Sequence, residues 1–157
     1  MSAAEPAHEW FARPDAPEGG DGLRFSCTMC GNCCTGVPGY VLIDDAETAA
    51  LARRVRLSVT DFLDRFTHVL EEGRSLTERK TSFGFDCVFL DRESIPGKAV
   101  CGVYEDRPKQ CRTWPFWPSN LSSRRAWLEA KRKCPGIDHG PVTPLTQIRV
   151  LRDSCKI

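Results

Sequence analysis

Four of the nine cysteines stand in one short segment, Cys27-Thr-Met-Cys30-Gly-Asn-Cys33-Cys34. A two-residue spacer lets two thiolates point at one ion from a tight turn. Structural zinc and iron–sulfur clusters are each held by four such ligands. Unligated cysteines are often buried as small apolar side chains, but the glycines and polar residues of the segment 27–39 predict a surface loop. The motif therefore predicts metal binding through thiolates.

The adjacent residues Cys33 and Cys34 give information on how many metal ions the protein binds. Adjacent side chains diverge in an extended segment, so we expect the two to serve different ions or different corners of one cluster. Two four-thiolate sites, or one polynuclear site with shared thiolates, would use eight cysteines. The predicted metal ligands are Cys27, Cys30, Cys33, Cys34, Cys87, Cys101, Cys111 and Cys134.

Three other residues are not expected to be ligands. Cys155 lies four residues beyond Leu151 on the inner side of a predicted helix, which favours apolar packing. His139 stands in an Asp-His-Gly turn, but thiols are already plentiful there. His68 is expected on the polar face of a helix. For Cys87 and Cys101, burial on an apolar strand face remains an alternative to metal binding.

Helical periodicity and capping residues predict about four helices. Asp44 or Asp45 begins one that runs to about Val55, and a second follows Ser58 or Thr60 and keeps one apolar face as far as Leu70. The others are expected from about 121 to 133 and from about 143 onward. Alternating apolar residues predict a short strand at 40–43 and a hairpin centred near Ser94. That register places Cys87 opposite Cys101. The predicted fold is α+β: a small antiparallel sheet, these helices, and loops pinned by metal.

Composition narrows the possible partners. The 157 residues carry a formal charge of +1 with scattered basic residues, so no nucleic-acid surface is predicted. No secretory signal or membrane-spanning run is visible, which predicts a cytoplasmic protein and no membrane partner. In a reducing compartment, clustered cysteines favour metal over disulfides. Residues 1–22 are expected to form a flexible tail, with Trp10 and Phe11 packing on the domain as an alternative, and residues 23–157 one metal-binding domain with a modest core.

The motifs together resemble the CxxCxxCC cysteine-cluster family, whose domain is described as zinc- or iron-chelating. The matching segments begin at the motif above and continue through Cys87-Val-Phe-Leu-Asp91, Cys101-Gly-Val-Tyr104, Arg107-Pro108-Lys-Gln-Cys111-Arg112-Thr-Trp-Pro115-Phe116 and Cys134-Pro135-Gly136. The resemblance implies zinc or an iron–sulfur cluster bound by the eight cysteines. It also carries a distant link to flagellin lysine N-methylation, which uses S-adenosylmethionine. Arg107 and Arg112 are expected to donate to thiolates, and the aromatic residues after them to exclude water or form ordinary core.

Three functions are compatible with this sequence. The first is a metal-binding protein without catalysis, and the second is an enzyme, either an iron–sulfur oxidoreductase or a protein methyltransferase. The third is a structural zinc module that binds a protein partner. The sequence carries no P-loop, dinucleotide fingerprint or catalytic triad pattern. It therefore predicts metal ions as partners, leaves a protein partner or substrate open, and leaves the choice between enzyme and binding protein to experiment.

Overall fold

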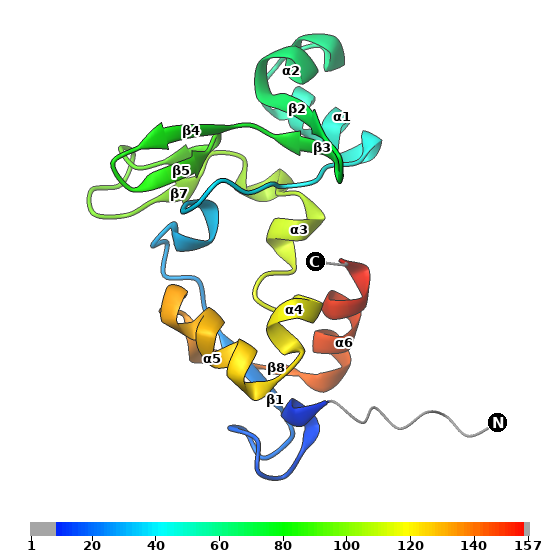
Figure 1. The fold of residues 1–157 in the computed structure, drawn as a ribbon, viewed down its shortest axis with the longest axis vertical. Helices are drawn as coiled ribbons and strands as arrows, with labels where there is room; N and C mark the ends of the chain where they lie inside the picture. The colour runs from blue at the N-terminus through cyan, green and yellow to red at the C-terminus, as the bar shows by residue number, and fades with distance from the viewer. Residues whose placement is uncertain (1–8, 156–157) are drawn as a thin grey trace, which may run out of the picture. The chain divides into compact units, whose positions relative to one another are not determined.

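The computed structural model describes residues 9–155 and divides the chain into two compact units. One, here called the terminal unit, combines Met1–Thr28 with Thr113–Ile157. The other, the cysteine unit, is the continuous stretch Met29–Arg112. The predicted α+β class is confirmed, since helices alternate with two-stranded antiparallel sheets (Figure 1). No helix within residues 9–155 has the length and apolar character needed to cross a membrane.

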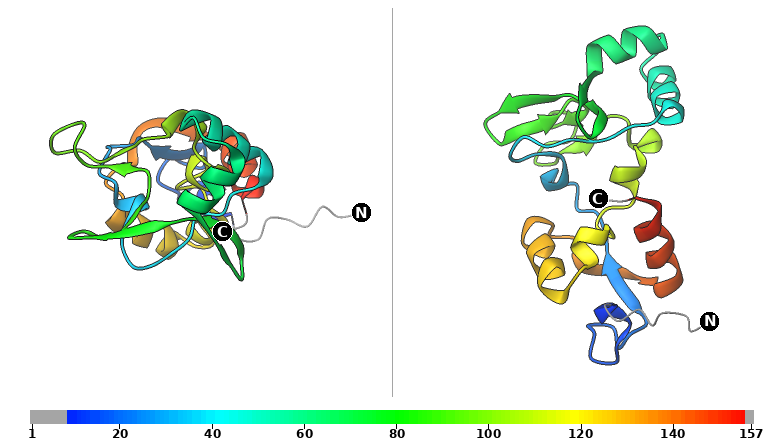
Figure 2. Two further views of the ribbon diagram at one scale, coloured as in Figure 1. Left: turned by 90° about the horizontal axis from the view of Figure 1, so that it is seen from above. Right: turned by 45° about the vertical axis from the view of Figure 1, so that its right-hand side comes forward.

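The terminal unit is built around a pair of strands from opposite ends of the chain. β1 (Gly22–Phe25) pairs antiparallel with β8 (Ile137–Pro144), and Leu23 faces Thr143. Helices α5 (Arg124–Lys133) and α6 (Leu145–Ser154) pack against this pair from different sides (Figure 1 and Figure 2). The short helix α4 (Pro118–Leu121) precedes α5. The core is aromatic and aliphatic, and its members include Phe11, Leu23, Phe116, Trp127, Ile137 and Ile148.

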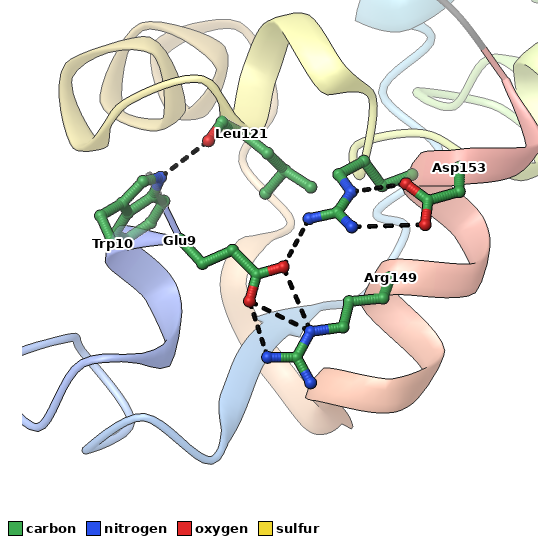
Figure 3. A network of polar contacts seen from close by, with 6 residues as sticks. Glu9, Trp10, Leu121, Arg149 and Asp153 are labelled. Carbon is green, nitrogen blue, oxygen red and sulfur yellow. Dashed lines mark hydrogen bonds and ion pairs between the residues drawn. The ribbon is translucent and has the colours of Figure 1, made fainter. Parts of the chain in front are cut away.

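Residues 9–21 of the expected tail are folded, whereas residues 1–8 lie outside the described part of the chain. The 3₁₀ helix η1 (Trp10–Ala12) buries Phe11 in the core. The Trp10 indole donates to the Leu121 carbonyl at 3.0 Å. Glu9 accepts hydrogen bonds of 2.6 to 3.2 Å from Arg149 and one of 2.7 Å from Arg152 (Figure 3). These contacts match the alternative in which the aromatic pair packs on the domain.

The sequence from 118 to 133 forms two helices where one was expected from about 121. The break falls after α4, because Ser123 is extended and its side chain accepts the Ala126 N–H as the N-cap of α5. The last helix begins at Leu145, close to its expected start, and Pro144 precedes it in an extended conformation.

Two helices in the first half of the cysteine unit, α1 (Asp45–Arg54) and α2 (Val59–Phe66), contact each other (Figure 2). α1 matches its prediction. The Asp44 side chain accepts the Glu47 N–H, and the Glu47 side chain accepts the Asp44 N–H. α2 is shorter than expected. Thr67–Leu70 form strand β2 instead, paired with β3 (Gly73–Leu76). The turn at 71–72 allows Val69 to pair with β3, and this strand pairing outweighs the helical periodicity of the sequence.

The predicted hairpin register is wrong. β4 (Glu78–Thr81) pairs with β5 (Gly84–Cys87), and β6 (Leu90–Asp91) pairs with β7 (Val100–Cys101). Cys87 therefore faces Glu78, and Cys101 faces Leu90. A two-residue loop closes β4–β5 and gives Cys87 a local partner, while the longer hairpin forms from β6 and β7 with a shifted register.

Two smaller features complete the cysteine unit. The expected strand at 40–43 is reduced to a single bridge between Leu42 and Ser75. A second hydrophobic cluster includes Ile43, Leu51, Phe62, Leu76 and Val103, with Cys87 and Cys101 partly buried against it. Each unit thus has a core of its own, although the chain length suggested one.

Candidate metal site

Six of the eight predicted ligands belong to the cysteine unit, on five separate elements. Cys30 lies in the loop before the 3₁₀ helix η2 (Asn32–Cys34), which carries Cys33 and Cys34. Cys87 ends β5, Cys101 ends β7, and Cys111 lies on the short helix α3 (Lys109–Arg112). The remaining two, Cys27 and Cys134, belong to the terminal unit.

The loop that carries the first thiols is fixed by close backbone packing. Ala99 N–H donates to the Met29 carbonyl at 2.8 Å. Gly31 adopts a left-handed conformation with φ 76°, and a Cβ there would lie 2.6 Å from the Ala99 side chain. Only glycine fits this position, so the turn directs the following residues into η2.

Cys33 and Cys34 lie closer together than their adjacency predicted. Their Sγ atoms are 3.7 Å apart, because the segment is a 3₁₀ turn and not an extended strand. Four sulfurs bound tetrahedrally at 2.3 Å from one ion are about 3.8 Å apart. The pair therefore already has the separation of two ligands of one ion. The expectation that these side chains diverge is corrected by this geometry.

Five thiols on four elements influence one another's pKa values. The hydrogen bond between the Cys33 and Cys34 thiols lowers the pKa of Cys33 to about 7 and raises the pKa of Cys34 far above its usual value. Burial raises the pKa of Cys87 to about 11, with a further contribution from Cys101. Burial, followed by Cys87 and Cys101, also raises the pKa of Cys111. Such mutual opposition to ionisation is relieved by a bound cation.

Direct ligation geometry is not formed. In the described part of the chain, no three His, Cys, Asp or Glu side chains are arranged to hold an ion directly. The donor set nevertheless suits zinc or iron, since its members are thiols that a soft metal binds as thiolates. Short loops carry Cys30 to Cys34, and small side-chain rotations there change the sulfur positions most easily.

Two guanidinium groups act on the thiols. Burial raises the pKa values of Cys101 and Cys111, and the charge of Arg107 partly offsets that rise. The same charge makes a small contribution to the lowered pKa of Cys33. The Arg107 Nε–H donates to the Tyr104 carbonyl at 3.0 Å, and its guanidinium lies 3.7 Å from the centre of the Tyr104 ring. It thus offsets thiolate charge from a fixed position. Arg92 interacts with Cys34 in the same way.

Sequence reasoning missed the carboxylate beside the site. Asp86 is fully buried on β5 and precedes Cys87. Hydrogen bonds from Arg92, and then from Thr35 and Thr81, lower the pKa of Asp86 to about 2, so it is ionised. An acidic residue between Phe85 and Cys87 in an apolar alternation was the available signal, because a buried charge requires a partner.

The other predicted residues lie in the terminal unit or away from the cysteines. Ser26 N–H donates to the Gly136 carbonyl at 3.0 Å, which joins the segments that carry exposed Cys27 and buried Cys134. Cys155 is buried at the end of α6, as expected for apolar packing. His139 lies on β8, and His68 lies on β2, not on a helix.

The aromatic residues after Arg112 form core contacts in the terminal unit. Phe116 stacks on Trp127 with ring centres 5.8 Å apart, and Trp114 meets Trp117 edge to face at 4.9 Å. This matches the ordinary-core alternative for the three side chains Trp114, Phe116 and Trp117.

The comparison with known families agrees with the cysteine pattern. The CxxCxxCC model, described as a "putative zinc- or iron-chelating domain", matches residues 26–135. The chain belongs to the CxxCxxCC family. The match spans all eight predicted ligands, including the two in the terminal unit, and leaves out Cys155. No solved structure matches this CxxCxxCC chain.

Proposed function

We propose that the chain is a metal-binding protein that holds zinc or an iron–sulfur cluster through cysteine thiolates in the cytoplasm. The centre of the ligand set is formed by five residues of the cysteine unit: Cys33, Cys34, Cys87, Cys101 and Cys111. Membership of a zinc- or iron-chelating family supports metal binding in general. A reducing compartment keeps such thiols available for metal.

The observation that carries the proposal is that η2, β5, β7 and α3 each contribute a cysteine to one interacting group, in which the Cys33 and Cys34 sulfurs are 3.7 Å apart. Cys34 is affected by Cys87 and Cys111, and Cys111 by Cys33, Cys87 and Cys101. Thiols brought together in this way are costly to ionise together. A divalent cation converts the repulsion into attraction and releases protons from the thiols as it binds.

The wider set of eight adds Cys30 from the same loop, and Cys27 and Cys134 from the terminal unit. Asn32 N–H points to Cys30 Sγ at 3.5 Å, which suits a sulfur that carries negative charge. Eight thiolates are enough for two four-ligand ions or for one polynuclear centre with shared sulfurs. The 3.7 Å separation of the Cys33 and Cys34 sulfurs favours a centre that both residues share.

The test is anaerobic purification of the full chain, followed by absorption spectra and metal analysis. Iron–sulfur charge-transfer bands identify iron, and a colourless protein with stoichiometric zinc identifies zinc. Single Cys→Ser variants at each of the eight positions are expected to lose metal, and Cys155→Ser serves as the matched control with unchanged metal content. Wild-type metal content in all five variants of the central set would overturn the proposal.

A separate assay addresses catalysis by the same protein. Transfer of a methyl group from S-adenosylmethionine to a protein lysine, or electron transfer through the bound centre, would make it an enzyme. Absence of both with metal bound is the result expected for a protein whose role is to hold the metal.

A further inference from the structure

Asp86 is a buried anion in a strand that is otherwise apolar. Its Oδ2 accepts the Arg92 Nε–H at 2.8 Å, and its Oδ1 accepts the Arg92 Nη2–H at 3.0 Å. The Arg92 guanidinium also lies 3.8 Å from the centre of the Phe83 ring. A two-pronged ion pair packed on an aromatic ring holds the carboxylate in one orientation. Asp86 is thereby a rigid acceptor within the cysteine unit.

The third hydrogen bond to this carboxylate comes from the segment that carries Cys30, Cys33 and Cys34, here called the thiol loop. Thr35 Oγ1–H donates to Asp86 Oδ1 at 2.5 Å. Thr35 directly follows Cys34, and Asp86 directly precedes Cys87. One hydrogen bond therefore links the immediate neighbours of two predicted ligands that are far apart in sequence.

A backbone contact beside this bond brings the same two segments together. Phe85 N–H donates to the Gly36 carbonyl at 2.8 Å. Gly84 has φ 131°, and a Cβ there would lie 2.7 Å from the Gly36 oxygen. The two backbone segments therefore touch with no side chain between them. The loop after Cys34 is thus docked on β5 at two successive positions.

We propose that Asp86, Arg92 and Thr35 act as positioning residues that hold the Cys34 thiol beside the Cys87 thiol for one metal centre. This inference rests on the proposed metal-binding function. Arg92 fixes Asp86, Asp86 fixes Thr35, and Thr35 fixes the backbone that carries Cys34. None of the three touches the metal. Hydrogen-bonded partners behind a ligand typically contribute 10- to 100-fold to metal affinity.

The decisive variant is Thr35→Val in the full chain. It removes the hydroxyl and preserves the side-chain shape, while Asp86 keeps its ion pair with Arg92, so the fold is retained. Thr35→Ser restores the hydroxyl. Thr48→Val is the matched control, because the buried Thr48 hydroxyl of the same unit donates to the Asp44 carbonyl on α1. Folding of each variant is verified by circular dichroism.

Affinity is measured for zinc by competition with a chromophoric chelator, and the thiolate-to-cobalt charge-transfer spectrum reports the ligand arrangement. Thr35→Val is expected to bind about 10- to 100-fold more weakly with an altered cobalt spectrum. Thr35→Ser and Thr48→Val are expected to match the wild type. Asp86→Asn is expected to weaken binding in the same direction as Thr35→Val.

The outcomes separate this inference from the function on which it rests. If the wild type binds metal through the cysteines and Thr35→Val binds equally well, the positioning role is overturned and the metal site stands. Equal weakening in Thr35→Ser would also overturn it, since the hydroxyl would then not be the cause. If the wild type binds no metal through its cysteines, both proposals fail together.

Discussion

The two units have different cores. The terminal unit fully buries large aromatic side chains, including Phe11 and Trp127. The cysteine unit packs a smaller set around Phe62 and Leu51 and adds the partly buried Cys87 and Cys101. Apolar burial stabilises by about 25 cal/mol per Å² without any ligand, whereas clustered thiols stabilise a fold only when a cation joins them. The comparison predicts that the terminal unit depends less on metal for its stability than the cysteine unit does.

Metal removal is expected to give the largest difference between the units. Structural zinc contributes about 10–16 kcal/mol in small thiolate domains, while ordering one loop residue costs roughly 1–2 kcal/mol of backbone entropy. Treatment of the metal-loaded chain with a chelator should abolish hydrogen-exchange protection first in residues 31–36. Protection in α5 and α6 should persist. Loss of protection in α5 before the thiol loop would contradict the contrast between the units.

Truncation of one aromatic side chain in each core sharpens the same comparison. Trp127→Ala should destabilise the terminal unit by about 3–5 kcal/mol, and Phe62→Ala should do the same in the cysteine unit. Denaturant unfolding with metal bound measures both. The Phe62 variant should become far more sensitive to chelator, whereas the metal content of the Trp127 variant should equal that of the wild type. Equal chelator sensitivity in the two variants would mean that metal supports both cores alike.

The ion pairs of Glu9 make the stability of the terminal unit pH-dependent. Hydrogen bonds from Arg149 lower the pKa of Glu9, with a further contribution from Arg152. Because the pKa of Glu9 is lower in the folded state, its ion pairs stabilise the fold at pH values above the unfolded-state pKa of about 4.3. This stabilisation is lost as the pH falls through the folded-state pKa. Glu9→Gln should cost about 1.5–3 kcal/mol at neutral pH, and the difference from wild type should vanish in acid. A difference that grows in acid would contradict this assignment.

Removal of a helix cap is expected to give the smallest change in stability. Asp44→Ala removes the charged side-chain acceptor of the capping box of α1, although the backbone N–H of residue 44 can still donate to Glu47. Ser123→Ala removes a neutral hydroxyl acceptor at the start of α5. Each is expected to cost about 0.5–2 kcal/mol, with the larger loss at Asp44. Thermal unfolding with metal bound measures both, and a larger loss at Ser123 would reverse the order expected from the bonds.

Local signals were the ones that sequence could predict. An N-cap at Asp44 or Asp45 predicted α1, and the glycines and polar residues around Cys27 to Cys34 indicated a loop. The sequence did not reveal that Thr67–Leu70 leave the helix, because a partner strand decides this. It also did not pair Cys101 with Leu90, since register depends on which hairpin closes first. The Asp86–Thr35 bond joins residues distant in sequence, and no periodicity reports such a contact.

The pairing of β1 with β8 has a consequence for synthesis on the ribosome. Leu23 cannot meet Thr143 until nearly the whole chain has emerged, because strands distant in sequence close late. Met29–Arg112 is continuous and is complete well before then. The thiols of this stretch are therefore available to cellular metal before β1 pairs with β8. Metal loading and chain elongation would then proceed together, with the terminal strands closing last.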